Sequence, residues 1–278
     1  MCELTTVGVT RRAFAGWSTA AALTARASLS LADTPLHESM VEVSTPDGKA
    51  DAFFVHPTSG RHPGVVFWPD ALGLRDAKKA MARRLASEGY AVLAVNPYYR
   101  NARAPLGLSF AALGSPEGRQ KLLPLMPALT AEAITRDGIA HVAFLDAQAA
   151  VDKARGIGVQ GYCFGGPFAV RTAAAVPGRV NGTATFHGGG LVTDKPDSPH
   201  RLLSQTQASF LIAVARDDDQ KAPGEKDTFR AAAESAGREA QIEVYAADHG
   251  WCVPDAPSYN QSEADRAWAR LLTHYARL

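Results

Sequence analysis

The first apolar runs after residue 40 are two short stretches separated by turn residues. Met40 to Ser44 and Ala50 to Val55 flank Pro46-Asp47-Gly48, and two β-rich runs joined by such a turn predict a β-hairpin. After this hairpin, apolar runs of strand length alternate with stretches of helical composition as far as the C-terminus. Such an alternation predicts a sheet with helices on both of its faces.

The remaining predicted elements follow the same alternation. Strands are expected at Gly64–Trp68, Ala91–Val95, Ile157–Gly161, Gly182–Phe186, Phe210–Ala215 and Ile242–Tyr245. Helices are expected from about Asp76 to Glu88, Thr130 to Asp152, Phe168 to Ala175, Lys226 to Ala236 and Ser262 to Tyr275. The segment Arg100–Pro127 is rich in proline and glycine, so we expect it to be irregular and to lie over a cleft. The fold class is therefore α/β, with a mostly parallel sheet in one domain, residues 33–278.

Composition and charge narrow the classes of partner. Of the 278 residues, 46% are hydrophobic and 21% are charged, which suits one large core. The net charge is +1 and the basic residues are scattered, so no electrostatic footprint for nucleic acid is present and a small-molecule partner is expected. The cysteines Cys2, Cys163 and Cys252 are too few for a disulfide framework, and no C-x-x-C pair occurs. We expect neither a metal nor a cofactor.

The N-terminal segment resembles a twin-arginine export signal. Arg11 and Arg12 precede a modestly apolar run, and the small residues Ser30 to Ala32 precede Asp33, which is the order of a charged region, an apolar region and a cleavage site. The alternative is an ordinary amphipathic helix, because Arg26 interrupts the apolar run. The run is too short for a stable membrane anchor. We expect residues 1–32 to direct the protein through the twin-arginine export machinery to the periplasm or the medium, and to be removed.

A cysteine stands at a turn that suits a nucleophile. In Gly161-Tyr162-Cys163-Phe164-Gly165-Gly166, a predicted strand runs into a predicted helix. A nucleophile elbow needs small residues on both sides of its central residue, because the tight turn brings neighbouring backbone into contact. The free N–H groups of the following helix would stabilise a thiolate. The alternative is a buried structural cysteine in a glycine-rich turn.

The acid and the base that a nucleophile requires follow later in the chain. Asp217-Asp218-Asp219 comes after the predicted strand at Phe210, and His249 comes after the predicted strand at Ile242. The order nucleophile, acid, histidine is that of α/β-hydrolases, and strand ends at this edge of an open sheet carry ligand chemistry. Taken singly, the aspartates could be a solvated turn and the histidine structural. Their joint order favours catalysis.

At this point the chain, from about Met40 to its C-terminus, resembles the dienelactone hydrolase family of cysteine-dependent α/β-hydrolases. The motifs that carry the resemblance are G-Y-C-F-G-G, F-W-P-D-A-L-G-L-R, E-G-Y-A-V-L-A-V-N-P-Y-Y-R, A-R-D-D-D and D-H-G-W. The resemblance implies that Cys163 is the nucleophile, His249 the base and one aspartate of the 217–219 run the third member. We select Asp218 from its spacing to the strand, with Asp219 second because D-Q-K-A-P is similar to a turn of the family.

Two positions depart from the family pattern. Asp70 stands where the family has a glutamate that contacts the resting thiol, so we expect Asp70 to modulate the thiol with a shorter side chain. Arg100 stands where family members bind a substrate carboxylate, while the second arginine of that site is replaced by Cys252 or Val253. The resemblance therefore implies a modest preference for carboxylate-bearing esters through Arg100, in a pocket that differs from that for dienelactone itself.

The sequence His187-Gly188-Gly189-Gly190 is similar to the oxyanion motif of lipases. That motif precedes the nucleophile, in the loop after an early strand, whereas here it follows Cys163. We interpret it as a turn. The oxyanion hole is assigned to the backbone N–H groups of Ala71 and Phe164.

The expected reaction is attack of the Cys163 thiolate on an ester or lactone carbonyl, followed by hydrolysis of the thioester by water that His249 activates. The alternative is a non-catalytic binding or thiol redox-sensing protein in which Cys163 and Cys252 form a reversible disulfide. A sensor does not require the Asp–His pair, and this pair favours the hydrolase.

Overall fold

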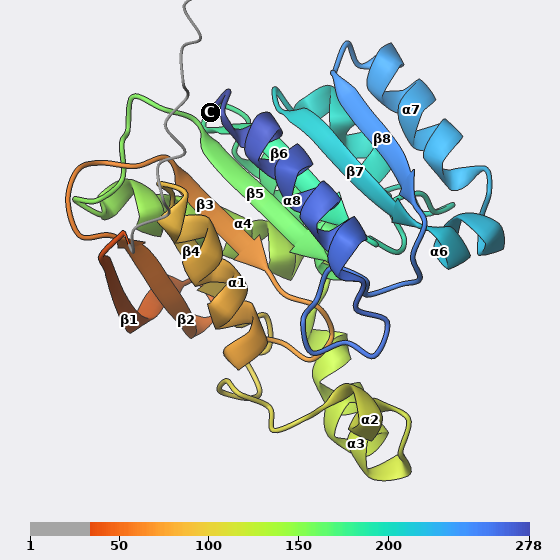
Figure 1. The fold of residues 1–278 in the computed structure, drawn as a ribbon, viewed down its shortest axis with the longest axis horizontal. Coiled ribbons are helices and arrows are strands. Elements are labelled where there is room, and N and C mark those ends of the chain that lie inside the picture. Colours follow the sequence, from red (N-terminus) through yellow and green to blue (C-terminus); the bar gives the residue numbers. More distant parts are fainter. Residues whose placement is uncertain (1–33) are drawn as a thin grey trace, which may run out of the picture. The chain divides into compact units, whose positions relative to one another are not determined.

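The computed structural model of the protein describes residues 34–278, and the expected export segment 1–32 lies outside them. In the described part, eight strands form one sheet in the order β1-β2-β4-β3-β5-β6-β7-β8 (Figure 1). β2 pairs antiparallel with both β1 and β4, and all neighbours from β4 to β8 are parallel. This arrangement confirms the predicted α/β class with a mostly parallel sheet. The strands are β1 (Leu36–Thr45), β2 (Gly48–Pro57), β3 (Gly64–Trp68), β4 (Ala91–Val95), β5 (Ile157–Tyr162), β6 (Val180–Phe186), β7 (Ser209–Ala215) and β8 (Ala240–Tyr245).

Helices cover both faces of the sheet (Figure 1). On one face, α1 (Asp76–Ser87) and α8 (Gln261–Tyr275) contribute buried residues such as Leu85 and Leu271 to one apolar cluster. On the other face, α4 (Ala131–Ala147), α5 (Gly165–Ala175) and α7 (Glu225–Ser235) contribute to a second cluster. The sheet thus separates two cores, and its central strands β3 and β5 are buried along their whole length. Such burial on both faces explains why β3 is a continuous apolar run and why β5 does not alternate between apolar and polar residues, although it contains the buried Gln160.

The segment between β4 and α4 is more ordered than its composition predicts. It contains α2 (Phe110–Leu113), α3 (Pro116–Leu122) and the 3₁₀ helix η1 (Leu123–Ala128). The side chains of Ser109 and Ser115 accept hydrogen bonds from the backbone N–H groups of Ala112 and Gly118, so each α-helix begins with a serine cap. The expectation of an irregular segment was therefore wrong in detail.

Two further element boundaries differ from the prediction. α4 ends at Ala147, before the expected end at Asp152, and Val151 instead forms an isolated parallel bridge with His62. A short helix, α6 (Arg216–Lys221), follows β7 where the aspartate run suggested a loop. A second 3₁₀ helix, η2 (Pro199–Gln205), lies between β6 and β7.

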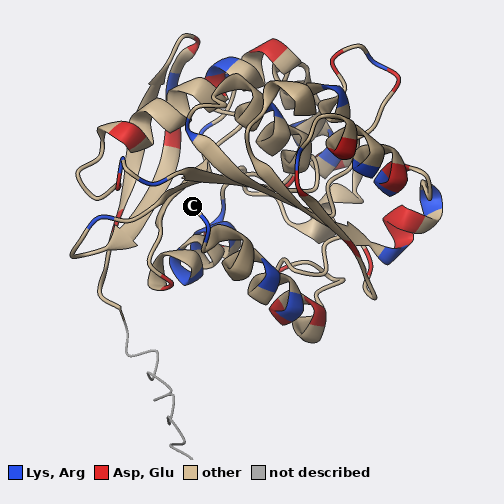
Figure 2. Ribbon diagram, turned by 90° about the horizontal axis from the view of Figure 1, so that it is seen from above, with Lys and Arg blue, Asp and Glu red and all other residues tan. Residues whose placement is uncertain are grey.

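Positively and negatively charged residues are both distributed over the molecule. Figure 2 shows Lys and Arg interspersed with Asp and Glu, several of them on the helices. Many of these charges are paired, as in the contact of Arg277 with Glu239 at 2.7 Å. Among residues 34–278, no helix combines the length and the apolar character needed to cross a membrane.

Candidate active site

The turn between β5 and α5 has the backbone geometry of a nucleophile elbow. Cys163 has a φ of 55°, in the left-handed region that side chains rarely adopt. A Cβ at Gly161 would lie 1.9 Å from the carbonyl oxygen of Gly165, and a Cβ at Gly165 would lie 2.5 Å from that of Pro69. Neither contact is possible for a real side chain. Both glycines are therefore required by close backbone approach, and the sulfur-bearing residue stands at the tip of the turn.

The three aspartates of α6 bind three different groups. Asp218 Oδ2 lies 2.6 Å from Nδ1 of His249, so its carboxylate holds the imidazole ring. Asp217 Oδ1 accepts a hydrogen bond from the backbone N–H of His249 at 2.7 Å. Asp219 instead accepts from Nζ of Lys226 at 2.6 Å. Asp218, rather than Asp219, thus has the position of the orienting acid.

The charge of His249 is set by its two neighbours. Burial opposes a positive ring, but the hydrogen bond with Asp218 and the interaction with the sulfur of Cys163 outweigh it and raise the pKa of His249 to about 10. A histidine with this pKa is an imidazolium at neutral pH. A positively charged ring therefore lies beside the sulfur of Cys163.

Cys163 and His249 open into one cavity of about 400 Å³. Its other walls come from Ala71 in the loop after β3, from Phe110 and Leu113 on α2, and from the segment 256–258 after β8. The loops at the C-terminal ends of β3, β5 and β8 therefore meet here, as expected for a ligand site in an open α/β sheet. Residues of the segment expected over a cleft do lie at this cavity.

The expected oxyanion donors have suitable surroundings. Ala71 lines the cavity, and its carbonyl oxygen accepts a hydrogen bond from Tyr98 Oη at 2.9 Å. Phe164 is the N-cap residue of α5, directly after Cys163. Within residues 34–278, the backbone N–H groups of Ala71 and Phe164 donate to no other residue. Ala71 lines the cavity, whereas Phe164 is not among its lining residues, although it directly follows Cys163.

Asp70 also lines the cavity, but its carboxylate is fully engaged. It accepts from Arg75 at 2.7 and 3.1 Å, pairs with Nζ of Lys78 at 2.8 Å and accepts from the backbone N–H of Leu72 at 3.0 Å. Burial alone would raise the pKa of Asp70, but Lys78 and Arg75 outweigh it and hold the pKa well below its usual range. Asp70 is thus a permanent carboxylate that stabilises the loop after β3. Sequence reasoning missed Arg75 and Lys78, since only the fold shows them converging on Asp70.

The structure does not bring Arg100 to the cavity. Its guanidinium binds the buried Asp137 of α4 at 2.7 and 2.8 Å and Asp47 of the β1–β2 turn at 2.6 and 3.0 Å. Neither Arg100 nor its two partners lines the space beside Cys163. The residue joins α4 to the hairpin, and its donors are already used within the chain.

His187 contributes a second imidazole that sequence reasoning interpreted only as part of a turn. Its φ is 42°, its side chain is buried, and its ring lies edge-on to that of His249 with 4.6 Å between centroids. Burial and then the charge of His249 hold the pKa of His187 well below its usual range, so this ring is neutral. Both of its ring nitrogens lack a hydrogen-bond partner among residues 34–278. The neutral ring supports His249 without adding a charge.

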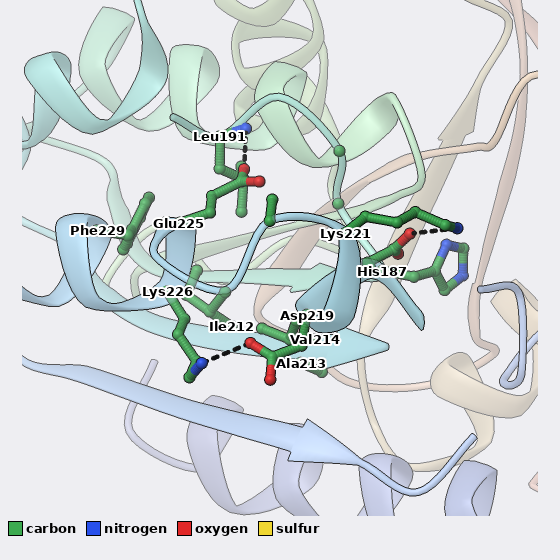
Figure 3. A pocket seen from close by; sticks show the side chains of 14 residues that line it. His187, Leu191, Ile212, Ala213, Val214, Asp219, Lys221, Glu225, Lys226 and Phe229 are labelled. Carbon is green, nitrogen blue, oxygen red and sulfur yellow. Dashed lines mark hydrogen bonds and ion pairs between the residues drawn. The ribbon is translucent and has the colours of Figure 1, made fainter. Parts of the chain in front are cut away.

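A smaller cavity, of about 150 Å³, is also lined by His187 (Figure 3). Phe229 lies at one end of it and His187 at the other, and the ion pair of Lys226 with Asp219 lies along its side. His187 and Asp218 line this cavity, and His187 lines the larger one as well. The histidine therefore borders both spaces.

Cys252 lies away from the cavity beside Cys163. Both cysteines are free thiols, and Cys252 lines a separate space with Tyr162 and Trp268. Burial raises the pKa of Cys252 to about 12, which keeps it a thiol. A disulfide between Cys163 and Cys252, required by the redox-sensing alternative, is absent from the described structure.

Comparisons with known proteins show the family of this chain. The sequence profile of the dienelactone hydrolase family matches residues 50–277. The chain belongs to the dienelactone hydrolase family. A carboxymethylenebutenolidase of Rhodococcus opacus is 31% identical over 193 residues, which cover 66% of this chain and 69% of the relative. Membership of the dienelactone hydrolase family and this relative identify the protein as a hydrolase.

Solved structures share the fold. A dienelactone hydrolase-like promiscuous phosphotriesterase from metagenomic libraries has a TM-score of 0.69 and 24% identity, over 87% of this chain and 98% of that one. The dienelactone hydrolase of Anabaena variabilis has a TM-score of 0.61 and 17% identity, over 86% and 98% of the two chains. At these identities the likeness establishes the α/β-hydrolase fold of the family.

Proposed function

We propose that the protein cleaves carboxylic ester or lactone bonds through a triad of Cys163, His249 and Asp218. The observation that carries this proposal is the 2.6 Å contact between Asp218 Oδ2 and His249 Nδ1, made at a cavity that Cys163 and His249 both line. In this role Asp218 fixes the orientation of the imidazole and stabilises its positive charge.

In the first half of the reaction, the thiolate of Cys163 attacks the carbonyl carbon and the carbonyl oxygen becomes an oxyanion. The backbone N–H groups of Ala71 and Phe164 donate to this oxyanion. When the intermediate collapses, the bond to the alcohol oxygen breaks and the imidazolium of His249 gives that oxygen its proton. The products are a thioester on Cys163, the free alcohol and a neutral His249.

In the second half, water replaces the alcohol. His249 takes one proton from the water as its oxygen attacks the thioester carbonyl, and the carbon–sulfur bond then breaks. The carboxylic acid leaves and the thiolate–imidazolium pair is restored. Because a thiolate is a good leaving group, this site suits esters and lactones better than amides.

The test uses p-nitrophenyl acetate and matched variants. Wild-type protein should release nitrophenol and carry one acetyl group in intact-mass spectra of rapidly quenched samples, whereas Cys163→Ala should do neither. Asp218→Asn should lower kcat by roughly 10²–10⁴-fold, while Asp219→Asn, whose carboxylate binds Lys226 instead, serves as the control and should change kcat little. Unchanged turnover in Cys163→Ala would refute the mechanism, and a reversal of the two aspartate results would move the acid to Asp219.

We further propose that the protein is exported through the twin-arginine machinery, on the pattern of Arg11, Arg12 and the small residues before Asp33. Replacing both arginines with lysine keeps the charge and should leave the precursor in the cytoplasm. N-terminal sequencing of the exported form should start near Asp33. Full-length protein confined to the cytoplasm of wild-type cells would contradict export.

A further inference from the structure

We infer that the substrates of this site are uncharged esters or lactones with apolar acyl groups, and that carboxylate-bearing ones are disfavoured. The inference rests on the proposed function of Cys163 and names the substrate class of the same site. It opposes the preference that the resemblance implied through Arg100, and it follows from what lines the cavity.

The walls that would face an acyl group are apolar. Ala71, Phe110, Leu113, Ala256 and Pro257 present only hydrocarbon side chains to the cavity. Apolar walls with few polar groups favour apolar ligand atoms, since each polar group buried against them loses its hydration.

The polar groups at the cavity are already satisfied or uncharged. Ser258 donates its hydroxyl to the carbonyl oxygen of His249 at 2.6 Å. His187 is neutral, because burial lowers its pKa. The charge on His249 has its counter-charge in Asp218. None of the lining residues in the described chain is Lys or Arg.

Two cations close to the cavity, Arg75 and Lys78, are paired with carboxylates of the chain. Arg75 uses one side of its guanidinium for Asp70, at 2.7 and 3.1 Å, and the other for Asp255, at 2.7 and 2.8 Å. Lys78 pairs with Asp70 at 2.8 Å and is buried completely. Two positive and two negative groups balance one another. Asp70, the one carboxylate among the cavity's lining residues in the described chain, belongs to this balanced group, so the group offers an anionic substrate no net positive charge.

A substrate carboxylate in this cavity would therefore lose water without gaining a cationic partner. Burial of an unpaired polar group costs enough in proteins to weaken binding by roughly ten- to a hundred-fold, and a charge costs more. We expect kcat/KM for a carboxylate-bearing ester to be lower than that of its neutral counterpart by at least about ten-fold.

The experiment compares p-nitrophenyl butyrate with p-nitrophenyl hemisuccinate, whose acyl chains have the same length and end in a methyl group or a carboxylate. The expected result is a butyrate-to-hemisuccinate ratio of kcat/KM above about ten, after correction for the intrinsic hydrolysis rates. Leu113→Arg places a cation in the apolar wall and should lower this ratio several-fold. Leu113→Gln, polar but uncharged, is the matched control and should leave the ratio above that of Leu113→Arg.

Each outcome bears on one idea. Equal or faster cleavage of the hemisuccinate by the wild-type protein would overturn the inference while leaving the proposed function standing. An unchanged ratio in Leu113→Arg would also overturn it, because charge at the wall would then not govern selectivity. If neither ester is cleaved in a Cys163-dependent manner, the proposed function fails and the inference fails with it.

Discussion

The buried ion pair of Asp70 with Lys78 allows a sharp test of the electrostatics behind the cavity. The ammonium of Lys78 is fully buried, and Asp70 is its salt-bridge partner at 2.8 Å. Asp70→Asn keeps the shape and an oxygen that Arg75 and Leu72 can still contact, but it removes the counter-charge of the lysine. Breaking such a pair leaves an uncompensated buried charge, which typically costs about 3–5 kcal/mol.

The fold limits this cost, because Lys78 can lose its proton instead of remaining charged. Burial already lowers the pKa of Lys78 in the wild-type protein, although Asp70 opposes that shift. Full deprotonation of Lys78 at pH 7 costs about 4.6 kcal/mol. This is the difference between pH 7 and the lysine pKa of about 10.4 in the unfolded chain, multiplied by about 1.36 kcal/mol per pH unit. Since the wild-type protein bears part of this cost, we expect Asp70→Asn to lose about 3 kcal/mol at pH 7, or roughly 6–12 °C in Tm.

The sign of the pH dependence follows from proton counting. A lysine whose folded pKa is lowered binds fewer protons in the folded than in the unfolded state, so stability rises with pH until the unfolded pKa of about 10.4 is passed. In Asp70→Asn the folded pKa of Lys78 is lower still, so the pH range in which stability rises begins at a lower pH than in the wild-type protein. The difference in unfolding free energy between the two should therefore narrow as pH rises from 7 to 10.

Urea unfolding, followed by the fluorescence of the buried Trp68 and Trp251, measures these free energies. Adding Lys78→Met to Asp70→Asn removes the unpaired ammonium and should recover most of the loss. Asp255→Asn is the control, since this partner of Arg75 is 40% exposed and should cost about 1 kcal/mol or less. A loss under about 1 kcal/mol in Asp70→Asn, parallel pH curves, or no recovery in the double variant would refute the reasoning.

Three further outcomes follow from the site and its supports. Gly161→Ala should abolish soluble folded protein, judged by circular dichroism, because its Cβ would meet a backbone oxygen at 1.9 Å. Arg100→Met should lower stability by about 3 kcal/mol in urea unfolding, since it leaves the buried Asp137 unpaired, yet it should not change the butyrate-to-hemisuccinate ratio. With the pKa of His249 raised to about 10, the imidazolium persists up to that pH, so kcat/KM should fall only above it. In Asp218→Asn the alkaline limb of this pH profile should move to lower pH, and an unmoved limb would contradict the role of the carboxylate.

The parts of the fold that sequence could predict are those with local causes. The elbow at Cys163 was readable because glycines stand at fixed spacing around it, and the backbone that a Cβ at Gly161 would meet belongs to the same turn. The buried strands were readable because continuous apolar runs stand between turn residues. By contrast, α2 and α3 depend on single serine caps in a segment whose prolines and glycines suggested irregular structure. The overall composition of the segment gives no indication of a helix start that depends on one serine.

The parts that sequence could not predict depend on contacts between distant segments. Arg75 reaches Asp255, 180 positions away, and Arg100 reaches Asp47 and Asp137 across more than thirty positions. An arginine's partner in the fold decides whether its guanidinium is free for a ligand or used within the chain. The resemblance implied a carboxylate-binding role for Arg100, but in this chain its donors bind two internal carboxylates.

The aspartate run shows how a short helix gives identical residues different tasks. Successive residues of a helix point about 100° apart, so Asp217, Asp218 and Asp219 at the start of α6 are directed to different groups. The first binds the backbone N–H of His249, the second binds its ring, and the third binds Lys226 at the start of α7. The run is therefore not a redundant cluster of charge. Two of its carboxylates fix the main chain and the ring of the same histidine, and the third ties α6 to the next helix, so α6 holds His249 at two points.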